Sequence, residues 1–118
     1  MLAPSFEATD WPRILGAYDD LLDLEHSPVA ALNRSVALAK VEGPDAGLQT
    51  LDELEKAPEL RRYYPLFATR GELLRRLGRR EESVACYRRA LALTPSAPVR
   101  RFLQRRIDEH SALRSTAS

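Results

Sequence analysis

Cysteine is nearly absent from this chain of 118 residues, in which Cys86 is the only example. One thiol cannot form an internal disulfide, and it cannot supply the several cysteines of a structural zinc site. The two histidines, His26 and His110, are 84 residues apart, and neither has a histidine or cysteine three or four positions away. We therefore expect neither a metal centre nor any other cofactor.

Long apolar runs and glycine-rich segments are also missing. No run approaches the ~20 residues that a membrane-spanning helix requires. Residues 1–10 contain neither the basic segment nor the apolar segment of a secretion signal. The five glycines are isolated from one another, so none belongs to a phosphate-binding loop. These absences predict a cytoplasmic protein with no membrane partner.

Catalytic side chains in a recognisable pattern are lacking as well. Asp19, Asp20 and Asp23 form an acidic cluster, but their spacing is that of a solvent-facing helix surface and not of paired catalytic carboxylates in a cleft. Cys86 has the helical, apolar neighbourhood of a small buried side chain. We predict that the chain is not an enzyme, and we rank a small-molecule sensor or hydrolase last among the alternatives.

The chain does contain abundant charge, and its sign differs between the two halves. Residues 1–60 carry four basic and twelve acidic side chains, whereas residues 61–118 carry fourteen arginines and five acids. The halves can pack beside each other and partly neutralise, or the basic half can bind an acidic protein partner. A nucleic-acid surface is less favoured, because no aromatic or glycine pattern of a known reader accompanies the arginines.

Helix boundaries are clearly marked along the chain. A side-chain cap precedes a first-turn proline at Asp10-Trp11-Pro12 and at Ser27-Pro28, and Gly78 is suited to a left-handed helix end. Similar signals predict helices near 11–25, 29–41, 44–56, 62–77, 80–93 and 97–113. No segment alternates with period two for long enough to form a strand. We expect residues 1–8 to be a disordered N-terminus or a linker, 9–113 one helical domain, and 114–118 a frayed tail.

The predicted helices also repeat. Tyr18–Leu24 is similar to Tyr87–Leu93, and related segments recur at spacings of 33–36 residues, the period of tetratricopeptide arrays. Residues 64–97 fit one such unit best. The expected structural positions of the repeat are Ser35, Gly47, Phe67, Gly71, Ser83, Tyr87 and Pro95. The small residues let two helices approach closely while the large ones fill the space around them, with the tightest contact expected between Gly71 and Ser83. The predicted fold is therefore all-α, a tetratricopeptide-like α-α superhelix of about six antiparallel helices.

The array begins with an unpaired helix at residues 10–27. An array that starts in this way leaves an apolar face uncovered, so we expect the chain to be part of a longer protein.

Candidate interaction residues follow from the repeat. Two adjacent aromatics on one helix cannot both face inward, so Tyr63 or Tyr64 is expected to line a groove. Asn33, Arg34 and Arg70 form a partial version of the set with which helical adaptors bind a C-terminal carboxylate. On the last helix, Arg101 and Arg105 belong to a basic flank, which either caps the array or docks an acidic partner. The alternative function from these residues is a stand-alone tetratricopeptide adaptor that binds a peptide.

Several sequence strings together carry a more specific resemblance. The most distinctive are Ser27-Pro28-Val29-Ala30-Ala31-Leu32-Asn33-Arg34 and Leu73-Leu74-Arg75-Arg76-Leu77-Gly78-Arg79. Weaker ones are Thr9-Asp10-Trp11-Pro12, Glu42-Gly43-Pro44 and Tyr87-Arg88-Arg89-Ala90-Leu91 followed by Arg101-Phe102-Leu103. Over residues 5–110 the chain resembles the helical C-terminal extension of bacterial RNA polymerase sigma factors of the extracytoplasmic-function type.

The resemblance implies a regulatory domain that modulates transcription initiation. Its implied partners are the sigma-factor core regions, RNA polymerase or a regulatory protein. The modules that read promoter DNA would lie outside these 118 residues, so the resemblance implies DNA contact only through those missing regions.

Overall fold

The computed structural model describes residues 9–25 and 27–117, with side chains as far as His110. These residues form six α-helices and one short 3₁₀ helix. The helices are α1 (Trp11–Leu24), α2 (Pro28–Glu42), α3 (Pro44–Leu54), the 3₁₀ helix η2 (Pro58–Leu60), α4 (Tyr64–Arg76), α5 (Arg80–Leu93) and α6 (Ala97–Ala117). The described part contains no strand, so the prediction of an all-α helical repeat is confirmed.

The expected capping signals define most helix ends. The Asp10 carboxylate accepts a hydrogen bond from the Arg13 amide, and the Ser27 hydroxyl accepts one from the Ala30 amide, each at 3.2 Å. Gly78 ends the turn after α4 with φ +78°, a left-handed conformation that suits glycine, as its position predicted. The expected linker at residues 1–8 lies outside the described residues.

Two boundaries differ from the sequence expectation. The segment between α3 and α4 contains η2, whose Leu60 is only 1% exposed and belongs to the core. Helix α6 continues to Ala117, four residues past its expected end at residue 113. The helix therefore includes residues 114–117 of the expected frayed tail, and Ser118 lies outside the described residues.

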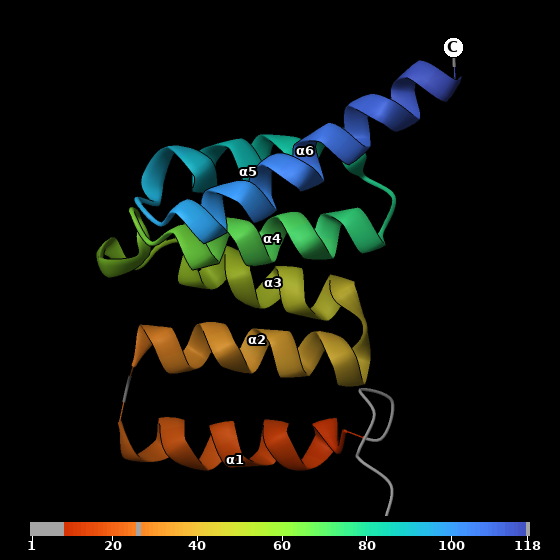
Figure 1. Ribbon diagram of the computed structural model, residues 1–118. Helices are drawn as coiled ribbons and strands as arrows, with labels where there is room; N and C mark the ends of the chain where they lie inside the picture. Colours follow the sequence, from red (N-terminus) through yellow and green to blue (C-terminus); the bar gives the residue numbers. More distant parts are fainter. Residues whose placement is uncertain (1–8, 26, 118) are drawn as a thin grey trace, which may run out of the picture.

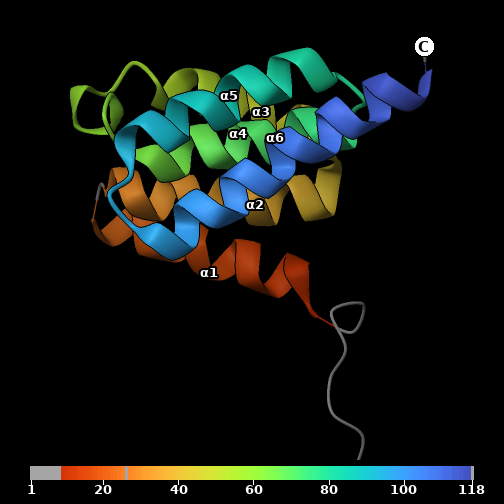
Figure 2. The same cartoon turned by 45° about the horizontal axis from the view of Figure 1, so that its top comes forward.

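Successive helices pack as antiparallel neighbours in one stack. Helix α1 lies at one end and α5 and α6 lie at the other, with α2, α3 and α4 between them (Figure 1). Helices α2, α4 and α6 share one side of the stack, and α3 and α5 lie behind them (Figures 1 and 2). These three helices are the first members of their repeat units, so residues at the same position of each unit lie on the same side.

The core runs through the stack from α2 to α6. Its most buried large side chains are Leu32, Leu51, Leu60, Leu66, Tyr87 and Leu103. Helix α1 contributes no buried residue, and its Leu24 is 85% exposed. It is held to α2 through the Arg34–Asp19 ion pair and by the Lys40 ammonium, which lies 5.8 Å from the centroid of the Trp11 ring. The described part of the chain contains no helix with the length and apolar character needed to cross a bilayer.

The close contacts of the repeat involve the expected residues, but Gly71 has a different nearest neighbour from the one expected. A Cβ atom added at Gly71 would lie 2.7 Å from Cε1 of the Tyr87 ring, so this ring, and not Ser83, makes the tightest contact. Ser83 acts differently, because its hydroxyl donates a 2.7 Å hydrogen bond to the Gly71 carbonyl. Tyr87 is larger than the residue expected to touch Gly71, and its ring fills the space that the missing side chain leaves. At the other small position, a Cβ atom on Gly47 would lie 2.9 Å from Ala39 and from Leu73.

The remaining structural positions lie as follows. Ser35 is fully buried and donates its hydroxyl to the Leu32 carbonyl one turn earlier. Phe67 is 6% exposed, and the Arg89 guanidinium lies 4.7 Å from its ring centroid. Pro95 lies in the exposed connection between α5 and α6, where it ends the unit. The residues that define the repeat therefore occupy close contacts, the core and a turn.

Candidate interaction surface

One side of the stack carries a repeated row of side chains that the core does not use. The residues recur at i, i+4 and i+7 on all three helices and at i+11 on α2 and α4, and the rows are 36 residues apart. We call this set the groove face; it comprises Val29, Asn33, Val36 and Lys40 of α2, Pro65, Thr69, Glu72 and Arg76 of α4, and Arg101, Arg105 and Asp108 of α6. All of these residues are exposed or half-buried.

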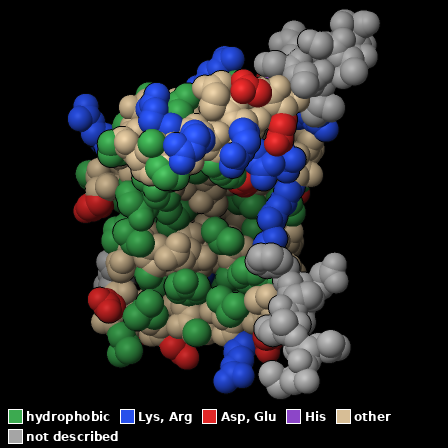
Figure 3. Space-filling model, viewed as in Figure 1, with side chains coloured by type: hydrophobic (Ala, Val, Ile, Leu, Met, Phe, Trp, Pro, Cys, Tyr) green, Lys and Arg blue, Asp and Glu red, His purple; other side chains and the backbone are tan. Residues whose placement is uncertain are grey.

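The groove face contains a hollow between the three helices. Its volume is about 310 Å³, and its lining includes Val36 from α2, Thr69 and Arg76 from α4, and Arg106 from α6. The face changes in chemistry along the stack, since valines lie on α2 and arginines on α6. In the space-filling view of this side, hydrophobic side chains gather towards α1 and α2, and basic side chains gather over α6 (Figure 3).

Arg34 and Arg70 have internal partners. Arg34 pairs with Asp19 of the preceding helix α1, and Arg70 pairs with Asp52 of the preceding helix α3 at 2.8 Å. The two arginines occupy equivalent positions 36 residues apart, so an equivalent arginine–aspartate ion pair is found in two successive units. Arg70 is also 3.2 Å from the Glu55 carboxylate, and its side chain is only 15% exposed. Of the partial carboxylate-binding set, only Asn33 lies on the groove face.

The adjacent tyrosines are both half-buried. Their ring centroids are 6.5 Å apart with planes tilted by 36°, and both rings pack against the core. Tyr63 precedes α4 and Tyr64 begins it, so the change from extended to helical backbone directs both rings partly inward. Neither tyrosine is among the residues that line the hollow between α2, α4 and α6.

The arginines of the last helix have distinct environments. Arg100 donates 2.6 Å and 3.3 Å hydrogen bonds to the carbonyls of Leu91 and Thr94 at the end of α5. Arg101 and Arg105 are exposed on the groove face, and neither forms an ion pair with a described residue. These two arginines are the candidate residues best placed to meet a partner.

Arg106 belongs to the same basic run of the last helix as Arg101 and Arg105, and its ion pairs join α6 to α4. Its guanidinium pairs with Glu72 of α4 at 3.1 Å and with Glu109 of its own helix at 3.3 Å. Partial burial lowers the pKa of the Arg106 guanidinium, because it disfavours the charged form. The neighbouring Glu72 and Glu109 carboxylates have a larger combined effect, and the pKa is raised overall. The sequence did contain a signal for this role of Arg106, because Arg106 lies 36 residues, one repeat period, after Arg70.

The opposite charges of the two halves stay largely separate. Arg70 links the halves, whereas Arg75, Arg79 and Arg106 pair with acids of their own half. Few ion pairs therefore join the acidic half to the basic half, and the α6 end of the groove face remains basic. An acidic surface is the complementary partner for such a face.

Cys86 lies half-buried on α5, close to Arg70. Burial raises the pKa of the Cys86 thiol, and the nearby Arg70 guanidinium opposes this rise only in part. The thiol therefore stays protonated at neutral pH, which makes it a poor nucleophile.

The fold defines an all-α helical repeat domain, and the groove face is an open surface on one side of it. No family model matches the chain. It is 37% identical over 112 residues to an uncharacterized protein of Rhizobium meliloti (strain 1021). The alignment covers 95% of this chain and 26% of that protein, so the chain spans about a quarter of the length of its relative.

Proposed function

We propose that this chain is the C-terminal regulatory and protein-interaction domain of an extracytoplasmic-function sigma factor, acting in the bacterial cytoplasm by binding and not by catalysis. The sigma-factor assignment comes from the sequence strings around residues 27–34 and 73–79. The observation that carries the binding role is the groove face, a row of side chains repeated on three helices and unused by the core. Its proposed partner is a sigma-factor core region or RNA polymerase.

The chemistry of the groove face specifies the kind of segment that would fit. Val29 and Val36 on α2 offer apolar contacts, and Arg101 and Arg105 on α6 offer two cations one helical turn apart. A helical segment with apolar residues at one end and carboxylates at the other would contact both the valines of α2 and the arginines of α6. Because Arg101 and Arg105 are exposed, their contribution would be greater to association rate and specificity than to affinity, and it would weaken with salt.

A stand-alone peptide adaptor is the second candidate. The observation that favours it is Asn33, which is exposed on the groove face where an adaptor would hold a peptide backbone. The reading frame upstream of Met1 discriminates the two functions. Sigma-type regions in frame support the regulatory domain, whereas an in-frame stop codon immediately before Met1 supports the adaptor.

The isolated domain is expected to show no preference for promoter sequence. The described arginines of its basic half are distributed over α4, α5, α6 and the connections before α4 and α5, and they are not gathered on one helix as they would be on the recognition helix of a helix-turn-helix. Weak, salt-sensitive attraction to any DNA is expected from the arginine excess alone. A competition gel shift at about 150 mM salt should give equal binding to a cognate promoter and to scrambled DNA. A preference above roughly tenfold, about 1.4 kcal/mol, would place promoter reading in this domain.

A further inference from the structure

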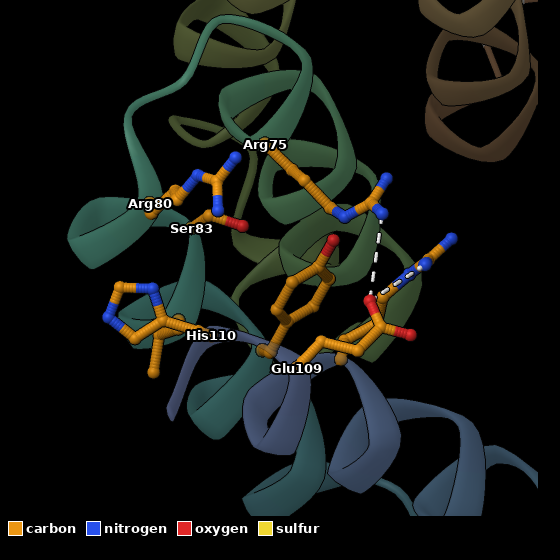
Figure 4. A pocket seen from close by; sticks show the side chains of 8 residues that line it. Arg75, Arg80, Ser83, Glu109 and His110 are labelled. Atoms are coloured by element: carbon orange, nitrogen blue, oxygen red, sulfur yellow. Dashed lines mark hydrogen bonds and ion pairs between the residues drawn. The ribbon is translucent and has the colours of Figure 1, made fainter. Parts of the chain in front are cut away.

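A second cavity lies beside the groove face, at the junction of α4, α5 and α6. It has a volume of about 240 Å³, and its lining includes Arg75, Arg80, Tyr87, Arg106 and His110. Figure 4 shows Arg75 and Glu109 on one side of this cavity and Arg80 and His110 on the other. Three helices therefore supply basic and hydrogen-bonding side chains to one small space.

Two buried polar atoms at this cavity have no hydrogen-bond partner among the described residues. One is the hydroxyl of Tyr87, a residue that is only 1% exposed, and the other is Nδ1 of His110. A buried polar group without a partner is unfavourable because it has lost its hydrogen bonds to water, which is why native proteins seldom contain one. Two of them lining one cavity indicate a site that a ligand completes.

The Tyr87 hydroxyl lies in a buried environment beside two polar side chains. Burial raises the pKa of Tyr87 to about 12, with Ser83 and Glu72 near enough to influence it in opposite directions. The Ser83 hydroxyl is donated to the Gly71 carbonyl and the Glu72 carboxylate accepts from Arg106, and the phenol forms a hydrogen bond with neither of them. The phenol O–H therefore remains a neutral donor at physiological pH.

The charge of the lining selects an anion. Arg75, Arg80 and Arg106 line the cavity together with one carboxylate, that of Glu109, and Glu72 pairs with Arg106 from outside the lining. Glu109 already bridges two of them, at 3.6 Å from Arg75 and 3.3 Å from Arg106. Arg80 is exposed and has no ion-pair partner among the described residues. The bridging carboxylate demonstrates that Arg75 and Arg106 can hold an oxyanion between them.

We propose that this cavity binds the phosphate group of a small phosphate monoester. The three guanidinium groups are the planar, multiple donors that phosphate oxygens prefer, and they outnumber the two carboxylates, Glu72 and Glu109, that pair with them. The phosphate takes over the guanidinium contacts of Glu109 and accepts the Tyr87 O–H and, from the appropriate tautomer, the His110 Nδ1–H. The site does not depend on the sigma-factor assignment, although Arg75 and Arg106 also line the groove.

The test is isothermal titration of the chain with inorganic phosphate and with methyl phosphate in a non-coordinating buffer, with acetate as a carboxylate comparison. We expect saturable binding of methyl phosphate in the millimolar range or tighter, and weaker binding of acetate. Arg80→Gln and Tyr87→Phe should each weaken it by about tenfold, the range for a lost charge-assisted or buried hydrogen bond. Glu109→Gln should strengthen binding, because it removes the competing carboxylate.

Arg101→Gln is the matched control, since Arg101 is an exposed arginine of α6 outside the cavity. It should bind methyl phosphate like the unmodified chain. Without ligand, Tyr87→Phe should unfold at the same temperature as the unmodified chain or higher, because it removes an unpartnered hydroxyl. Absence of saturable binding, an equal loss in Arg80→Gln and Arg101→Gln, or a weakening by Glu109→Gln would each overturn the proposal. Tighter binding of inorganic phosphate than of methyl phosphate would identify the free ion as the ligand and overturn the monoester.

Discussion

Replacing Gly71 by leucine is expected to destabilise the domain by ~1–3 kcal/mol, the cost of overpacking a filled core. The Tyr87 ring already occupies the space beside Gly71, and an added Cβ atom would lie 2.7 Å from Cε1 and 2.8 Å from Cδ1 of that ring. The ring cannot move freely, because Tyr87 is 1% exposed and packed between α4 and α6. Urea unfolding followed by circular dichroism measures the change in the free energy of unfolding.

Gly16→Ala is the matched control for this substitution. Gly16 lies within α1, and a Cβ atom there would meet no described atom beyond its own helix within 4 Å. Alanine should therefore leave stability unchanged or raise it by about 0.5–1 kcal/mol through helix propensity. If Gly71→Leu is tolerated as well as Gly16→Ala, the assigned contact between α4 and α5 is wrong.

Truncation of Leu51 to alanine is expected to cost ~2–5 kcal/mol, the range for a buried leucine that leaves a cavity. Leu51 is 0% exposed and belongs to the central cluster, where it joins α3 to the helices on both sides. This position holds an aromatic residue in the better-formed unit, so its neighbours are placed around a large side chain. The expected result is a lower urea midpoint with an unchanged denaturant slope.

Leu24→Ala provides the comparison, because Leu24 has the same side chain but is 85% exposed on α1. Its effect should stay within about 0.5 kcal/mol. Similar losses for Leu51→Ala and Leu24→Ala would mean that the core does not pass through α3.

The helices could be predicted because their signals are local. Asp10, Ser27 and Gly78 mark helix ends through hydrogen bonds and backbone angles within a few residues of themselves. The 33–36-residue period then required neighbouring helices to pair. The 3₁₀ helix at Pro58–Leu60 was missed because it is a single turn without periodicity, and it is held by the burial of Leu60 in a core formed elsewhere.

The partners of individual side chains were less accessible to sequence reasoning. Arg34 and Arg70 are candidate interaction residues, and each pairs with an acid on the preceding helix, a contact that the repeat pattern did not predict. Asp19 and Asp52 are 33 residues apart, whereas the two arginines are 36 residues apart. The equivalence of the two ion pairs can therefore be recognised in the sequence only when both helices of each unit are aligned. The contact of Gly71 with Tyr87 was missed for a similar reason, since it depends on the rotation of α5 against α4.

Shared arginines connect the two proposed binding surfaces. Arg75 and Arg106 line both the hollow of the groove face and the cavity at Tyr87. A phosphate held by these arginines would weaken their ion pairs with Glu109 and Glu72, which hold α6 against α4. Ligand binding in the cavity therefore offers a physical means of altering the groove face, through the charge and position of Arg106.

The most direct test of the central claim is transcription in vitro by RNA polymerase core with the complete gene product to which this domain belongs. We predict promoter-dependent initiation that changes at least about fivefold when residues 9–117 are deleted. The double substitution Arg101→Glu and Arg105→Glu, which reverses charge on the groove face without touching the core, should reproduce that change. A gene product that supports no initiation, or an unchanged rate after both alterations, would contradict the assignment of this domain to sigma-factor regulation.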